Sequence, residues 1–255
     1  MSPRRFKTLA KKRLNRRCGN MEMQTDERTE IEAIRKLYLQ MEPPGCDTWS
    51  PLRREVELQH RIRLMQEACH ALRMIPTPAE QLRVLDVGCG VGRSTRLFVD
   101  LGITPANIIG IDFRESALEF ARRVNPAIRY RAIAELADWP SEQVDMCIQC
   151  TVFSSIKDNT FRQETAKRMD QSVGESGFIF WWDIVHANTF AGGDALDPRS
   201  YFPNRPALYW REVSLEPEVD EAIRPLRGMR RLFCLPLRPF GFEITHRCAL
   251  LGPKR

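Results

Sequence analysis

Short apolar segments alternate with amphipathic helical segments between residues 82 and 182, and this alternation constrains the fold more than any other feature. Glycine or proline separates many of these segments, as is usual where strands and helices end. The expected strands are 82–87, 108–111, 128–132, 144–149 and 178–182. Such alternation predicts a parallel sheet covered on both faces. The right-handed crossover rule then makes it a doubly wound α/β domain.

The remaining segments are assigned around this domain. The chain divides into a basic leader at 1–26, an N-terminal helical segment at 27–79 and a main domain at 80–255. Strand character at 207–215 and 242–251 predicts an antiparallel pair at the C-terminal edge of the sheet. The stretch 186–206 is rich in glycine and proline, and it is expected to form a long, functional loop at the carboxyl edge.

Helical spacing also predicts which side chains face the core. Glycine and proline at 43–45 separate two expected helices in the N-terminal segment. The second of them shows an apolar stripe of Ile62, Met65, Cys69 and Leu72. The helix that follows the second strand shows Ala117, Phe120, Ala121 and Val124.

The net charge of +6 belongs to the leader rather than to the body of the protein. Residues 1–17 hold eight basic and no acidic residues, and the rest of the chain is slightly acidic. A nucleic-acid partner is therefore not expected. The leader is either a disordered tail or a short basic amphipathic face that contacts anionic lipid weakly. Translation from Met21 or Met23 would remove most of it.

The eight cysteines and the hydropathy pattern predict a cytoplasmic location. No run of about 18 apolar residues is present, so no membrane-spanning helix is expected. The N-terminus lacks the apolar region of a secretory signal, and a reducing cytosol with free thiols is the default. Cys147 and Cys150 lie in an expected strand, where residues three apart face opposite sides. No metal site is predicted.

A glycine-rich turn joins the first expected strand to the following helix. It contains Asp86 followed by Gly88, Gly90 and Gly92. Nicotinamide-binding turns have a third glycine where this chain has Arg93. Asp86 would also repel a pyrophosphate, whereas it suits a cationic amino group. A phosphate-binding P-loop is absent.

The next expected strand ends in a second acidic residue, Asp112, 20 residues after Gly92. A carboxylate accepts hydrogen bonds only, so it can receive both hydroxyl protons of a ribose. A glycine turn followed at this spacing by a strand-terminal acid favours a nucleoside-containing cofactor.

The Asp86-x-Gly88-x-Gly90-x-Gly92 turn and Asp112 resemble class I S-adenosylmethionine-dependent methyltransferases over residues 80–183. The resemblance implies a Rossmann-like, mostly parallel sheet with S-adenosyl-L-methionine as cofactor. It assigns Asp86 and the glycine turn to the methionine moiety and Asp112 to the ribose. Glu135 substitutes for the acid that often binds the adenine amino group, and Gln149 joins the cofactor-binding candidates.

The acceptor side lacks the signatures of nucleic-acid base methylation. The segment 149–155 holds no Asp/Asn-Pro-Pro-aromatic sequence, and Cys150 follows Gln149 rather than proline. Segments 49–52, 151–156 and 181–183 are similar to quinone-biosynthesis-like bacterial methyltransferases and to those that accompany polysaccharide and glycan biosynthesis. This similarity implies a hydroxyl acceptor on a small molecule or glycan intermediate.

Two residues near the end of the fifth strand are candidates for the catalytic base that a hydroxyl acceptor usually needs. Asp183 ends the strand, and His186 follows it with a side chain that titrates near neutrality. The alternatives are a loop cap for Asp183 and a surface position for His186. His60, His70 and His246 are interpreted as structural residues without partners.

Three other functions stay open on the sequence alone. They are N- or C-methylation of another metabolite, cofactor binding without catalysis, and a dinucleotide enzyme that tolerates Arg93 in place of glycine. The oligomeric state is not predicted.

Overall fold

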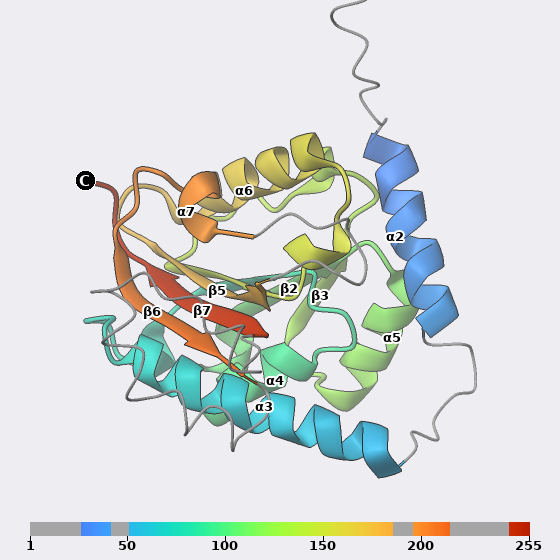
Figure 1. Cartoon of the computed structure of the whole chain (residues 1–255), viewed down its shortest axis with the longest axis horizontal. Helices are drawn as coiled ribbons and strands as arrows, with labels where there is room; N and C mark the ends of the chain where they lie inside the picture. Colours follow the sequence, from blue (N-terminus) through green and yellow to red (C-terminus); the bar gives the residue numbers. More distant parts are fainter. Residues whose placement is uncertain (1–26, 42–50, 186–195, 215–244) are drawn as a thin grey trace, which may run out of the picture.

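A computed structural model describes residues 27–41, 51–185, 196–214 and 245–255 (Figure 1). The basic leader and His186 lie outside these residues, as does half of the expected acceptor-side loop. The predictions made for them therefore stay predictions.

The sheet of the described chain has seven strands in the order β3-β2-β1-β4-β5-β7-β6. The strands are β1 (Val84–Val87), β2 (Ile108–Asp112), β3 (Arg129–Ala132), β4 (Met146–Cys150), β5 (Phe178–Ile184), β6 (Ala207–Val213) and β7 (His246–Leu251). Strands β1 to β5 run parallel, and β7 is antiparallel to both β5 and β6. The predicted fold class, with its antiparallel C-terminal edge, is confirmed.

Helices cover both faces of this sheet. They are α2 (Glu27–Met41), α3 (Pro51–Leu72), α4 (Arg93–Asp100), α5 (Glu115–Val124), α6 (Asn159–Val173) and α7 (Pro198–Tyr201), with short 3-10 helices η1 (Ala79–Gln81), η2 (Pro105–Asn107), η3 (Leu136–Asp138) and η4 (Phe153–Ser155). Buried residues of α3, α4 and α5 pack on one face, and those of α2 and α6 pack on the other. Figure 1 shows α6 and α7 on the opposite side of the sheet from α3.

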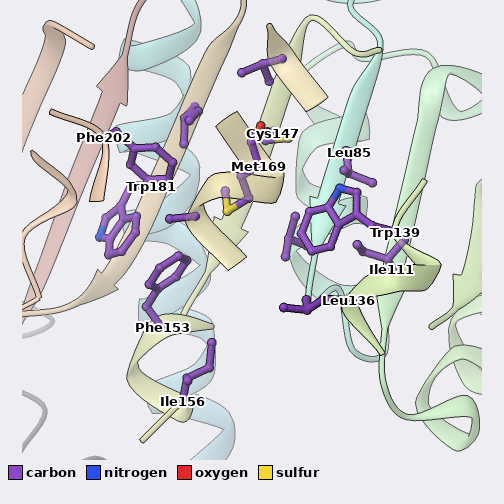
Figure 2. Packing of buried hydrophobic residues seen from close by; sticks show 14 of the residues in the cluster. Leu85, Ile111, Leu136, Trp139, Cys147, Phe153, Ile156, Met169, Trp181 and Phe202 are labelled. Carbon is purple, nitrogen blue, oxygen red and sulfur yellow. Dashed lines mark hydrogen bonds between the residues drawn. The ribbon is translucent and has the colours of Figure 1, made fainter. Parts of the chain in front are cut away.

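Strand β5 shows why the central strands of the sheet are mostly apolar. Ile179 and Trp181 belong to the apolar cluster beneath α6, whereas Phe180 and Trp182 belong to the cluster beneath α3 and α4. Figure 2 shows Trp181 beside Phe153 and Phe202 in the first cluster. Because successive strand residues face opposite layers, a strand buried on both faces needs apolar residues at nearly every position.

The same alternation separates the two cysteines of β4. Cys147 packs in the cluster with α6, and Cys150 packs against the opposite cluster. Burial raises the pKa of both thiols, which keeps them protonated. Separately, every helix in the described part of the chain is too short or too polar to span a membrane.

The buried faces of two helices differ from the predicted ones. In α5 the buried residues are Ala117, Leu118 and Ala121, while Phe120 and Val124 are each 39% exposed. In α3 the buried apolar residues are Leu64, Ala68 and Ala71, whereas the predicted Met65 and Leu72 are only partly buried and Ile62 is 48% exposed. Small side chains let a helix approach the sheet closely, so side-chain size displaces the face that apolar spacing alone predicts.

The interpretation of the histidines as lacking partners was wrong. The indole Nε1 of Trp182 donates a 2.7 Å hydrogen bond to Nε2 of His60. The ring of His246 lies 5.1 Å from that of His60 and 5.2 Å from that of Trp182. His70 stacks on Tyr209. His60 and His246 therefore join α3 to the antiparallel edge of the sheet.

This histidine pair predicts a loss of stability in acid. Burial lowers the pKa of His60 to about 4 and that of His246 to about 3, from about 6.5 when unfolded. The stability that these neutral rings provide is present above pH 6.5 and is lost as the pH falls through the folded pKa values. The buried carboxyls of Asp86 and Asp183 have raised pKa values and act in the opposite direction, so the histidine contribution is measured as a difference between variants in urea unfolding at pH 7.5, 5.5 and 4.5.

The variant His60→Gln identifies the source of this pH dependence. Its amide oxygen can still accept the indole proton and does not titrate, so stability should fall less between pH 7.5 and 4.5. His70→Gln changes an exposed histidine of the same helix and is the matched control. An equal pH dependence in His60→Gln and in the unmodified protein would contradict this assignment.

Candidate functional site

The strand order reverses beside β1, and this places a crevice at the carboxyl ends of the central strands. Strand β1 pairs with β2 on one side and with β4 on the other, so Val87 lies next to both Ile111 and Gln149. Connections leave these neighbouring strands toward opposite faces of a doubly wound sheet, and ligands bind where they diverge.

The glycine turn after β1 requires backbone conformations that other residues rarely adopt. Gly88 has φ +65°, and Gly92, the N-cap residue directly before α4, has φ +78°. A Cβ at Gly88 would lie 2.6 Å from a methyl group of Val152, and one at Gly92 would lie 2.6 Å from the hydroxyl of Tyr130. The turn thus passes close to its neighbours and leads directly into the N-terminus of a helix.

Asp112 joins the end of β2 to this turn. One carboxylate oxygen accepts the amide of Gly90 at 2.9 Å. The other accepts the backbone and side-chain nitrogens of Arg114, at 2.8 and 3.3 Å. Asp112 is 8% exposed and faces the crevice, where its remaining lone pairs can receive hydroxyl protons. The structure thus brings together Asp112 and Gly88, which the sequence predicted to share a site.

The crevice combines this carboxylate with flat apolar walls. Its lining includes Gly88, Asp112, Ile133, Leu136 and Trp139, and its volume is about 50 Å³. Figure 2 shows Leu136 and Trp139 on the same side of the core as Ile111. The indole nitrogen of Trp139 donates to Ser172 of α6 at 2.8 Å, which fixes the orientation of the ring. An apolar slot beside a carboxylate has the chemical character needed to bind a purine ring and its ribose.

Asp86 lies behind the glycine turn rather than in the crevice lining. It is 1% exposed, and the hydroxyl of Thr95 in α4 donates to it at 2.5 Å. Burial raises its pKa to about 7, an effect opposed by the Thr95 hydrogen bond. In this arrangement Asp86 holds β1 and α4 together beneath the turn.

Two other predicted cofactor residues, Glu135 and Gln149, lie outside the crevice lining and next to residues that form it. Glu135 caps the short helix η3, whose residue Leu136 lines the crevice. Gln149 is fully buried at the end of β4, and its side-chain oxygen accepts the amide of Val152 at 3.1 Å. Its side-chain nitrogen has no hydrogen-bond partner in the part of the chain that the structure describes. Gln149 therefore keeps a buried, unpaired donor behind the site, whereas Glu135 positions the wall.

Asp183 is occupied by backbone donors. One carboxylate oxygen accepts the amides of Phe153 and Ser154, at 3.0 and 3.4 Å, and the other accepts the amide of Ile184 at 2.8 Å. The residue is fully buried, and burial raises its pKa to about 6 against the effect of these bonds. This geometry is that of a loop cap, which fixes helix η4 after β4.

Sequence reasoning assigned no role at the site to helix α2. Ile34 and Tyr38 line the crevice, and Glu27 and Glu30 contact the loops that form its walls. These residues recur at spacings of three and four, so they share one face of the helix. In the sequence, this role could have been inferred from acidic residues that share one helical face with apolar residues.

Comparisons with known proteins agree with this geometry. A family model described as a methyltransferase domain matches residues 84–177. A ubiquinone biosynthesis O-methyltransferase from Rhizobium etli (strain CIAT 652) is 28% identical over 178 residues, which is 68% of this chain and 64% of that protein. A trans-aconitate 2-methyltransferase from Variovorax paradoxus (strain S110) is 38% identical over 97 residues, which is 37% of this chain and 35% of that protein.

A solved structure shows the same fold. The S-adenosylmethionine-dependent methyltransferase from Mesorhizobium loti superposes with a TM-score of 0.51 at 14% identity, covering 74% of this chain and 99% of that one. The fold of this chain is therefore the one that this methyltransferase adopts. Residues 84–177 of this chain are thus similar to the methyltransferase domain that the family model describes. The chain spans less than two thirds of the two curated relatives described above.

The loop-cap geometry of Asp183 predicts the behaviour of Asp183→Asn. The amide replaces one acceptor oxygen with a donor that faces backbone N–H groups, so the free energy of unfolding should fall by about 1–3 kcal/mol. Chemical denaturation measures it, with the surface variant Asp100→Asn as control. Unchanged stability together with a turnover loss of about a hundredfold or more would instead identify Asp183 as a base.

Proposed function

We propose that this protein transfers a methyl group from S-adenosylmethionine to an oxygen atom of a small molecule. The observation that carries the proposal is the crevice in which Asp112 faces apolar walls at the end of the glycine turn. The names of the two curated relatives, an O-methyltransferase and a methyltransferase of trans-aconitate, support a small acceptor.

Different residues of the chain would bind different parts of this cofactor. The carboxylate of Asp112 accepts the ribose hydroxyls, and the slot next to Trp139 receives the adenine ring. The turn at Gly88 brings the backbone close to the methionine part, where no side chain intervenes. The bound cofactor supplies an electrophilic methyl group on a sulfonium, and the protein contributes alignment and exclusion of water.

The acceptor is proposed to bind beyond the carboxyl ends of β4 and β5. Thr151, directly after β4, has φ +60°, and such strain at a residue other than glycine tends to occur at functional sites. Asp183 fixes the adjoining helix η4 through backbone amides. We assign Asp183 a positioning role, and His186 is the remaining candidate for the base.

A glycan intermediate is the second acceptor class within this proposal. It rests on the sequence similarity of segments 151–156 and 181–183 to methyltransferases that accompany glycan biosynthesis. Transfer of labelled methyl groups to hydroxyl- and carboxyl-bearing metabolites, and to nucleotide sugars and lipid-linked glycans, distinguishes the two classes. Transfer confined to nitrogen or carbon atoms would overturn the assignment of an oxygen acceptor.

Cofactor binding tests the proposal independently of the acceptor. Asp112→Ala should weaken the binding of S-adenosylhomocysteine by about 1–3 kcal/mol, or roughly 5- to 150-fold, because the hydrogen bonds to the ribose are lost. Titration calorimetry measures the affinity, and Asp100→Ala removes an exposed carboxylate as the matched control. If the unmodified protein bound NAD and not S-adenosylhomocysteine, the proposed function would be wrong.

A further inference from the structure

Helix α2 makes its polar contacts with the loops that form the crevice. The carboxylate of Glu27 accepts the backbone amide of Leu136, which follows β3. The carboxylate of Glu30 accepts the backbone amide of Lys157, which follows β4. Glu30 is 4% exposed although it carries a carboxylate. Both glutamates therefore bind main-chain groups whose positions define the walls of the site.

A third contact of α2 reaches the remaining wall. The guanidinium of Arg35 donates two hydrogen bonds, of 3.2 and 3.0 Å, to the carbonyl oxygen of Phe113. Phe113 directly follows Asp112 in the sequence. The loops after β2, β3 and β4 are thus all bonded to one helix of 15 residues. These contacts use backbone groups in each loop, so they depend on the loops keeping their present arrangement.

Tyr38 places α2 at the crevice itself. Its ring lines the crevice, and the guanidinium of Arg114 lies 3.9 Å from the ring centre. The hydroxyls of Tyr38 and Ser155 are 3.0 Å apart. Because the Ser155 hydroxyl donates to the carbonyl of Thr151 at 3.1 Å, Tyr38 is the donor in this pair. These two hydrogen bonds connect α2, through Ser155, to Thr151, the residue with positive φ directly after β4.

The crevice is narrow in the present arrangement of its walls. Its volume is about 50 Å³, whereas pockets for ligands of drug size occupy about 300 Å³ or more. Most of the other walls are sheet ends or short loops joined directly to them. Helix α2 is not part of the sheet, and among its described side chains the buried apolar ones are Ile31 and Ile34.

We propose that α2, which lies outside the matched domain, is the movable wall of the cofactor site and that Tyr38 contacts the bound cofactor. Glu27, Glu30 and Arg35 are positioning residues that hold the helix against the three loops. The helix detaches to admit the cofactor and docks again once it is bound. This inference rests on the proposed function, because it concerns the same site.

The first test measures the affinity for S-adenosylhomocysteine by calorimetry on the full chain. Tyr38→Ala should weaken binding at least tenfold, and Tyr38→Phe should weaken it less, because the ring is kept and only the Ser155 bond is lost. Leu39→Ala changes a neighbouring side chain that is 59% exposed, and it should bind like the unmodified protein. Equal affinity for Tyr38→Ala and Leu39→Ala would overturn the contact.

The second test measures the rate of cofactor-product release by stopped-flow tryptophan fluorescence, with Trp139 as the reporter in the crevice wall. The double variant Glu27→Ala/Glu30→Ala should release S-adenosylhomocysteine at least tenfold faster, because the helix has lost two hydrogen bonds to the crevice loops. Glu32→Ala, at an exposed position of the same helix, is the control. An unchanged release rate would overturn the positioning role.

The two proposals fail in different ways. Absence of S-adenosylhomocysteine binding in the unmodified protein would overturn the proposed function and this inference with it. Normal binding there, with unchanged affinity in Tyr38→Ala and unchanged release in the double glutamate variant, would overturn the inference alone. Thermal unfolding of each variant separates loss of binding from loss of the fold, and Tyr38→Phe retains the packing if Tyr38→Ala is unstable.

Discussion

The hydrogen bonds of Asp112 are the interaction on which the rest of the site depends. They join the end of β2 to the amide of Gly90 in the turn after β1, so one carboxylate fixes two neighbouring loops. The turn can lie there only because Gly88 and Gly92 adopt left-handed backbone conformations with no space for a side chain. A carboxylate already held by backbone donors is oriented before any ligand arrives, which reduces the cost of binding.

Buried polar groups position the surrounding walls in the same way. Asp86 ties β1 to α4 through Thr95, and Asp183 fixes the turn after β4. Glu30 of α2 holds the same turn from its other end, at Lys157. Each carboxylate is buried with hydrogen-bond partners, as the cost of desolvation requires. The site is therefore a set of loops whose backbone is held by side chains from neighbouring elements.

The elements of the fold were predictable because their signals are local. The strand before the glycine turn, the acid that ends β2 and the antiparallel edge pair follow from periodicity and from glycine and proline positions. The joint placement of Gly88 and Asp112 also followed, since parallel strands end at one edge of the sheet. In α5 the prediction was correct for Ala117 and Ala121 and wrong for Phe120 and Val124, because the packing distance that favours small residues is set by tertiary contacts.

Long-range partners explain the other differences between sequence and structure. Glu27 and Leu136 are separated by 109 residues, and His60 and Trp182 by 122, so no local pattern pairs them. Asp183 has the position expected of a base, yet the amides of Phe153 and Ser154 that occupy it come from another loop. Whether a carboxylate is available for chemistry depends on such partners, and the residue type alone does not determine it.

Hydrogen–deuterium exchange with and without S-adenosylhomocysteine tests the central claim that the glycine turn, the end of β2 and α2 enclose one cofactor site. The structure predicts slower exchange on binding in four segments together, at 86–92, 111–114, 133–139 and 27–41. Protection that omits the glycine turn and the end of β2 would contradict the site. Protection in those two segments with α2 unchanged would contradict its role as a wall.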